Sequence, residues 1–255
     1  MNYFFFLDNP FENLEPSVEI FNRPSNLKLC KDKLIDCDVY AFFSDGNKWY
    51  NEKIDKIKKE KSKIIRKRDL PSKFIDQNTF LGMIPENEKF VLENFNYMNA
   101  NPEWRGNIRI SGLKTSTSFQ GEYPGFFLDK KLSLVSCSPM VQSNFNNYFY
   151  LINLSNNPEF ISFEVDIYNE KKELLSSIPC FTNKINCIKL SEYINNFSSK
   201  MYVMSSKDRG GIPIYFSVND DHTCMSLEHT HPPIEYIYWG KREEFQKNKK
   251  SFWFE

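Results

Sequence analysis

The sequence is poor in the residues that build nucleotide-binding loops and helices. Its 255 residues include 9 glycines and only two alanines, Ala41 and Ala100. It contains no Gly-x-Gly-x-x-Gly segment, no phosphate loop ending in Gly-Lys-Ser/Thr and no Gly-x-Ser-x-Gly segment. Nucleotide-dependent chemistry is therefore not expected.

The sequence also lacks an excess of charge of either sign. It carries 33 basic and 33 acidic side chains, so its formal net charge is zero. This balance excludes a global polycation that would bind nucleic acid and a long acidic disordered tail. We expect no nucleic-acid partner.

Segments for export and membrane insertion are not evident. The apolar run at residues 3–7 has no basic residues before it and stops at Asp8, and no segment approaches the roughly 18 apolar residues of a spanning helix. The six cysteines form no CxxC pair, so we expect free thiols rather than disulfides or a cysteine-built zinc site. These features predict a cytoplasmic protein with no membrane partner.

What is abundant is Phe, Tyr and Ile, which favour strands. In residues 160–168, apolar Ile161, Phe163, Val165 and Ile167 alternate with polar residues, the period of a half-buried strand. Short strand-like segments separated by turn residues continue to about residue 235 and resemble those of immunoglobulin-like or jelly-roll sandwiches. We predict a mainly β protein with antiparallel β-sandwich architecture.

We divide the chain into three parts. Residues 1–130 form a β-rich unit, 131–235 a β-sandwich, and 236–255 a C-terminal helix with an aromatic tail. An internal repeat suggests that the first two are related, because Asn-Tyr-Phe-Phe-Phe-Leu at 2–7 resembles Asn-Tyr-Phe-Tyr-Leu-Ile at 147–152, and 18–22 resembles 165–169. Coincidence in a chain rich in Phe, Tyr and Asn is the alternative.

A basic insertion at residues 51–70 interrupts the first part. It has nine basic residues between Lys53 and Arg68, with Ile54, Ile57, Ile64 and Ile65 at helical spacing. We predict a solvated helix or hairpin. A helix that binds phosphate or anionic lipid is the alternative, but no aromatic residues are interleaved to stack on bases.

The three histidines, His222, His229 and His231, all lie within ten residues. On a strand, His229 and His231 share one face and can hold a divalent metal if a further ligand arrives from elsewhere, whereas Glu228 faces the other way. His222 precedes the strand and needs a bend in the chain to join them. Polar surface residues near turns are the alternative interpretation, since no His-Glu-x-x-His segment is present.

A second polar cluster runs from Thr115 to Gly125 and is rich in hydroxyl and amide groups. We select Gln120, Glu122 and Tyr123 as candidate ligand-binding residues, together with Glu228 of the histidine segment, and with Arg109 upstream to hold an anionic group. Glu122 is also a candidate metal ligand or general base beside the histidines. An ordinary polar loop is the alternative.

Three functions follow, in order of preference. The first is a non-catalytic β-sandwich protein that binds a carbohydrate or another polar ligand, with surface-polysaccharide metabolism as one setting. The second is a metal-dependent enzyme with the three histidines as ligands and Glu122 or Glu228 as acid or base. The third is a structural or assembly subunit that forms a homo-oligomer through the C-terminal aromatic tail.

Overall fold

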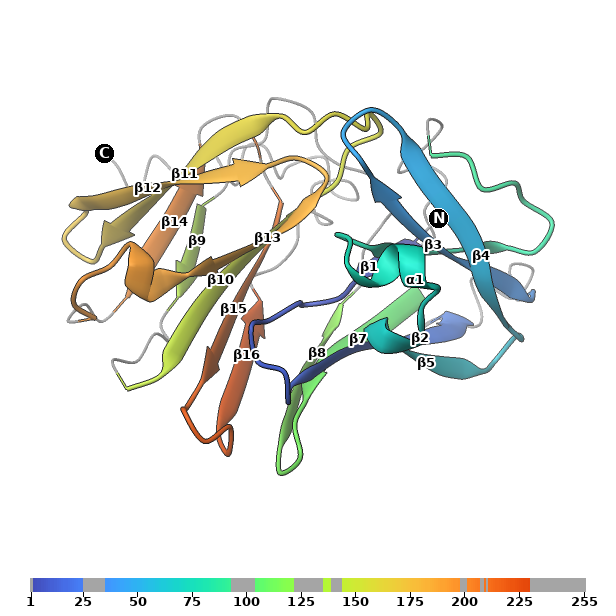
Figure 1. Cartoon of the computed structure of the whole chain (residues 1–255), viewed down its shortest axis with the longest axis horizontal. Helices are drawn as coiled ribbons and strands as arrows, with labels where there is room; N and C mark the ends of the chain where they lie inside the picture. Colours follow the sequence, from blue (N-terminus) through green and yellow to red (C-terminus); the bar gives the residue numbers. More distant parts are fainter. Residues whose placement is uncertain are drawn as a thin grey trace. The chain divides into compact units, whose positions relative to one another are not determined.

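The fold was obtained as a computed structural model, and it is mainly β with four antiparallel four-stranded sheets (Figure 1). The structure describes residues 2–24, 35–92, 104–121, 135–138, 144–197, 201–206, 209 and 211–229. The predicted boundary at 130/131 and the predicted C-terminal helix lie outside these ranges.

The chain divides into two compact units. Unit 1 comprises Met1–Phe126 and Asn156–Glu159, and unit 2 comprises Phe127–Ser155 and Phe160–Glu255. The strands of unit 1 are β1 (Asn2–Phe5), β2 (Glu15–Pro24), β3 (Cys37–Ser44), β4 (Trp49–Ile57), β5 (Ser62–Arg66), β6 (Phe80–Pro85), β7 (Trp104–Ser111) and β8 (Ser116–Gly121). Those of unit 2 are β9 (Val135–Ser138), β10 (Asn146–Asn153), β11 (Ser162–Asn169), β12 (Leu174–Phe181), β13 (Lys184–Lys189), β14 (Tyr202–Ser206), β15 (Ile212–Val218) and β16 (Met225–His229).

The two units have the same strand order. Unit 1 contains the sheets β1-β6-β3-β4 and β5-β2-β7-β8, and unit 2 contains β9-β14-β11-β12 and β13-β10-β15-β16. Adding eight to each strand number of unit 1 therefore gives unit 2. A 3₁₀ turn also follows the fifth strand of each unit, at Lys67–Asp69 and Leu190–Glu192.

This correspondence differs from the repeat proposed from the sequence. Residues 2–7 and 147–152 belong to β1 and β10, but the topology matches β10 with β2 and β11 with β3. The sequence similarity therefore pairs β1 with β10 and β2 with β11, whereas the topology pairs β2 with β10 and β3 with β11. Phe, Tyr and Asn are so frequent in this chain that two unrelated strands resemble each other.

The core of unit 2 lies between its two sheets. Phe163, Val165 and Ile167 of β11 are buried together with Phe149 of β10 and Tyr215 of β15, which belong to the other sheet. The alternation predicted for β11 is confirmed from residue 163 onward. Ile161 is the exception, because it precedes the strand and is 37 % exposed.

The basic segment at 51–70 does not contain the predicted helix or hairpin. Residues Trp49–Ile57 form β4, which pairs with β3, and Ser62–Arg66 form β5, which pairs with β2 in the other sheet. The segment therefore crosses from one sheet of unit 1 to the other. Ile65 is buried and Ile64 is 45 % exposed, which is the alternation of a strand.

Helical structure is short. The α-helix α1 (Ser72–Ile75) follows the basic segment and buries Phe74, whose ring contacts that of Phe43 edge-on with centroids 5.6 Å apart. In the ranges described above, no helix is long and apolar enough to cross a membrane. The cytoplasmic location stays a prediction.

A glycine on β7 allows the two sheets of unit 1 to approach closely. A Cβ atom at Gly106 would lie 2.5 Å from Cε1 of Phe4, a fully buried ring on β1. The Phe4 ring therefore occupies the place of a side chain at position 106. Gly112 differs, since its nearest neighbour, 2.8 Å away, is the terminal Cδ2 atom of Leu14.

We expect Gly106→Ala to lower the free energy of unfolding by about 1–3 kcal/mol, because the buried Phe4 ring must shift. Urea denaturation measures the change. Gly112→Ala is the matched control and should cost less, since the end of the Leu14 side chain can rotate away. Equal costs at the two positions would show that the Phe4 contact is not tight.

Candidate functional site

The outer side of the sheet β5-β2-β7-β8 is almost entirely polar. Register places Glu19, Asn107 and Gln120 in one cross-strand row, and Ser17, Arg109 and Ser118 in the next. The intervening residues face inward and are buried, including Val18, Ile20, Ile108, Ile110 and Phe119. We call the outward set the polar face: Glu15, Ser17, Glu19, Arg66, Asn107, Arg109, Ser111, Ser116, Ser118 and Gln120.

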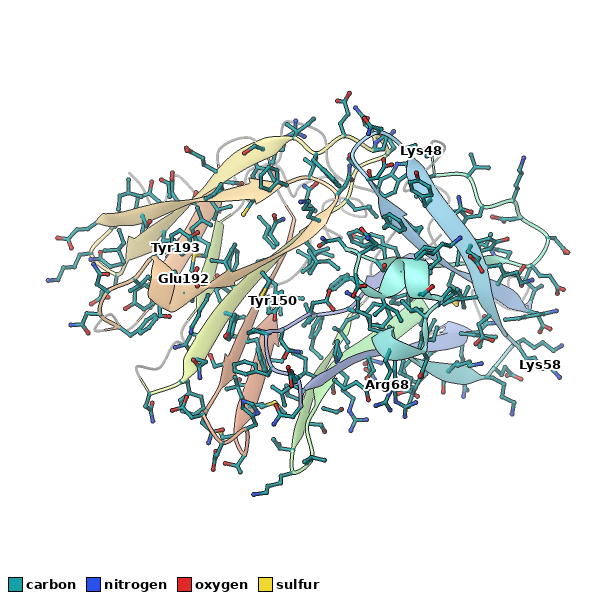
Figure 2. All side chains as sticks on the ribbon, in the orientation of Figure 1. Lys48, Lys58, Arg68, Tyr150, Glu192 and Tyr193 are labelled. Atoms are coloured by element: carbon teal, nitrogen blue, oxygen red, sulfur yellow. The ribbon has the colours of Figure 1, made fainter. Side chains whose placement is uncertain are left out.

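Part of the polar face is internally paired. Glu19 accepts hydrogen bonds from the hydroxyl of Ser62 at 3.1 Å and from the amide of Asn107 at 3.4 Å. Arg66 and Arg68 both approach Glu15, with N–O distances of 3.4 and 2.8 Å; Arg68 is labelled in Figure 2. Both acidic residues of this face, Glu15 and Glu19, are therefore already paired with neighbouring side chains.

The β7–β8 side of the polar face is less constrained. The Arg109 side chain is exposed, donates one hydrogen bond of 3.0 Å to the Ser116 hydroxyl, and has no ion pair with any carboxylate in the described part of the chain. Gln120 and Ser118 are also exposed. Hydrogen-bonding groups and one unpaired guanidinium thus face solvent together.

The structure therefore brings two of the predicted ligand-binding residues together. Arg109 and Gln120 lie on paired strands and on the same side of the sheet. Glu122 and Tyr123 lie outside the described residues. Sequence reasoning missed Asn107, although its alternation with Ile108 and Ile110 is a signal that could have identified it.

His222 lies in the hairpin turn between β15 and β16. Its backbone N–H donates to the Asn219 carbonyl at 3.1 Å, and its φ of 56° is in the left-handed region. The turn between β11 and β12 has the same form, with Lys172 at φ 66° and its N–H donating to the Asn169 carbonyl at 3.0 Å. The turn conformation therefore accounts for the position of His222 without a bound metal.

The chain between His222 and His229 leaves the hairpin turn and continues as a strand. Residues Met225–His229 are an extended strand paired with β15, and four residue steps span about 13 Å. No group of three His, Cys, Asp or Glu residues that could hold a metal occurs among the residues with described side chains. The His229 side chain and His231 lie outside this set, so their metal site stays a prediction.

Glu228 faces the interior of unit 2. It lies opposite Tyr215, a core residue, whereas His229 lies opposite Ile214 on the other side of the sheet. The strand register therefore places residues 228 and 229 on opposite sides of the sheet, as predicted. The Oε2 atom of Glu228 is buried and has no described hydrogen-bond partner, and burial raises the pKa of this carboxyl above its usual value.

Two of the four cysteines with described side chains are buried and unreactive. Cys37, Cys180, Cys187 and Cys224 are free thiols, as predicted, and the first two are buried. Burial raises the pKa of Cys37 and of Cys180 to about 12. Because the thiolate is the reactive form, these two side chains are inert at neutral pH.

These observations define an all-antiparallel β protein with two units of one topology and an exposed polar sheet face. No protein-family model matches the chain, and no curated protein matches it. Among solved structures, a crystal structure of the β-glucuronidase of Parabacteroides merdae with glycerol in its active site is similar over 91 % of this chain, with 14 % identity and a TM-score of 0.21. This chain spans 28 % of that protein, and a TM-score this low supports no conclusion about fold or activity.

We expect His222 to act as a turn residue. His222→Gly should change the free energy of unfolding by less than about 0.5 kcal/mol, while His222→Val should lower it by about 1–2 kcal/mol because a β-branched residue is strained at positive φ. Urea denaturation measures both. The Lys172→Gly and Lys172→Val pair is the control, and equal losses for both His222 variants would contradict a turn role.

We expect Glu228 to make stability depend on pH. Since its pKa is raised in the folded state, the folded protein holds this proton to higher pH than the unfolded chain. Stability therefore falls as pH rises from the ordinary glutamate pKa of 4.5 through the raised pKa. Glu228→Gln should therefore be more stable than the parent at pH 7, and the difference should shrink below pH 4.5. Denaturation across pH 3–8 tests this, with the exposed Glu164→Gln as control; a constant difference would contradict it.

Proposed function

We propose that the protein is a non-catalytic binding protein that holds a carbohydrate on the polar face. The observation that carries this proposal is the set formed by the exposed side chains of Arg109, Ser118 and Gln120 and the half-buried Asn107 on one side of the paired strands β7 and β8. Strands position these side chains on a rigid sheet, so the entropy cost of ordering them on binding is small.

The chemistry of the polar face suits a polyhydroxylated ligand. The side-chain amides of Asn107 and Gln120 each offer donors and an acceptor, and serine hydroxyls offer both. Each sugar hydroxyl also donates and accepts, so neighbouring hydroxyls can pair with neighbouring positions of the sheet.

An apolar margin adds a stacking surface. Phe21 is half-buried and Ile64 is 45 % exposed, and they occupy diagonal positions on the paired strands β2 and β5. Aromatic and aliphatic surfaces of this kind can cover the CH groups of a pyranose ring. Ile64 lies opposite Glu19 and therefore in the same cross-strand row as Asn107 and Gln120.

Arg109 suits a ligand that carries an acidic group. Its guanidinium presents a planar fork of donors that matches a carboxylate or sulfate, and no described carboxylate competes for it. An acidic surface polysaccharide would provide such groups, and its metabolism is the setting that we propose.

The experiment is a titration of the purified full chain with a panel of neutral and acidic oligosaccharides by isothermal calorimetry. We expect at least one to bind, and we expect Arg109→Ala and Gln120→Ala each to weaken its affinity roughly tenfold, because each removes a hydrogen-bonding partner. Arg109→Lys retains the charge and should weaken binding less than Arg109→Ala for an acidic ligand.

Lys171→Ala is the control, since this exposed residue lies in a turn of unit 2. It should bind as the parent does. Affinity that is unchanged in both polar-face variants would exclude this face as the site, and the absence of binding across the panel would exclude the carbohydrate function.

A further inference from the structure

An arginine in unit 2 is buried, and its side chain has no partner among the described residues. Arg209 precedes β15 and is only 9 % exposed. Ten ion-pair contacts occur among the described residues, and none includes Arg209. Its side chain also donates no hydrogen bond to any residue whose placement the structure gives.

The backbone around Arg209 is held in place. The Ser206 hydroxyl donates to the Arg209 carbonyl, and Ser206 itself is buried at the end of β14. A Cβ atom at Gly211 would lie 2.7 Å from the Ile152 carbonyl oxygen and 2.7 Å from Cδ1 of Leu151, so the chain here packs directly on β10. Arg209 is therefore fixed at one end of the unit 2 sandwich by its neighbours in the chain.

The burial of an unpaired guanidinium is energetically unfavourable. Arginine keeps its proton in a protein, so the positive charge must be balanced by another group or by solvent. Buried charges in proteins are paired or coordinated for this reason. None of the Arg209 nitrogens is among the fully buried atoms that lack a partner, so the guanidinium retains access to solvent.

We propose that Arg209 is an anion-binding residue whose ligand is an oxyanion of a small molecule, either a carboxylate or a phosphate or sulfate group. The planar guanidinium pairs with two oxygens of such a group at once, which neutralises the charge and satisfies several donors together. This site lies in unit 2 and does not depend on the polar face of unit 1.

The experiment is thermal unfolding of the full chain titrated separately with inorganic phosphate, sulfate and acetate, with chloride at equal ionic strength as reference. Binding to the folded state alone should raise the unfolding midpoint in a saturating manner, by about 5 °C at an anion concentration 100-fold above Kd. Saturation with acetate indicates a carboxylate ligand, and saturation with phosphate or sulfate alone indicates a tetrahedral oxyanion.

The variants assign the effect to this residue. Arg209→Gln should abolish the saturating rise, and Arg209→Lys should weaken the apparent affinity roughly tenfold because the bidentate geometry is lost. Arg23→Gln, at an exposed site in unit 1, should respond as the parent does. A parent midpoint that follows chloride would overturn the proposal and indicate that a carboxylate of the chain itself neutralises Arg209, as would an equal rise in Arg209→Gln.

Discussion

Backbone hydrogen bonding between antiparallel strands is the interaction on which the rest of this structure depends. Pairing places successive side chains on opposite sides of a sheet, so every strand has one inward and one outward row. In β7 this alternation buries Ile108 and Ile110 and leaves Asn107 and Arg109 outside. The same periodicity therefore builds the core of unit 1 and the polar face that we propose as its binding surface.

The two units use one strand order for different surfaces. In unit 1 the outward row of β7 is polar, while in the corresponding strand of unit 2, β15, both rows are buried, including Tyr215 on one side and Ile214 on the other. Topology therefore does not determine which surface is available for binding. That depends on the side chains of each unit, because a fold can present unrelated sites on the same framework.

Ion pairs between charged side chains also depend on how the strands pair. Several basic residues of 51–70 pair with acidic residues, as in the contacts of Lys53 with Asp38 and of Lys63 with Asp55. Exposed pairs of this kind contribute little to stability. Seven of the described lysines and arginines form such ion pairs. Arg109 and Arg209 form none with a described carboxylate, and they are the two that we propose bind an external group.

The sequence by itself determined the mainly β class, the alternation in β11 and the presence of a polar segment near Gln120, because these depend on local composition and on a period of two. It did not identify the strands at 51–68, since the isoleucines at 54, 57, 64 and 65 fit helical spacing, and the pairing that makes strands of this segment is with residues far away in the sequence. Strand order, the position of Arg109 and Gln120 on one side of a sheet, the inward position of Glu228 and the burial of Arg209 all depend on contacts between residues distant in the chain. Only the tertiary structure could decide them, because pairing partners are chosen by packing across the whole unit rather than by neighbours in sequence.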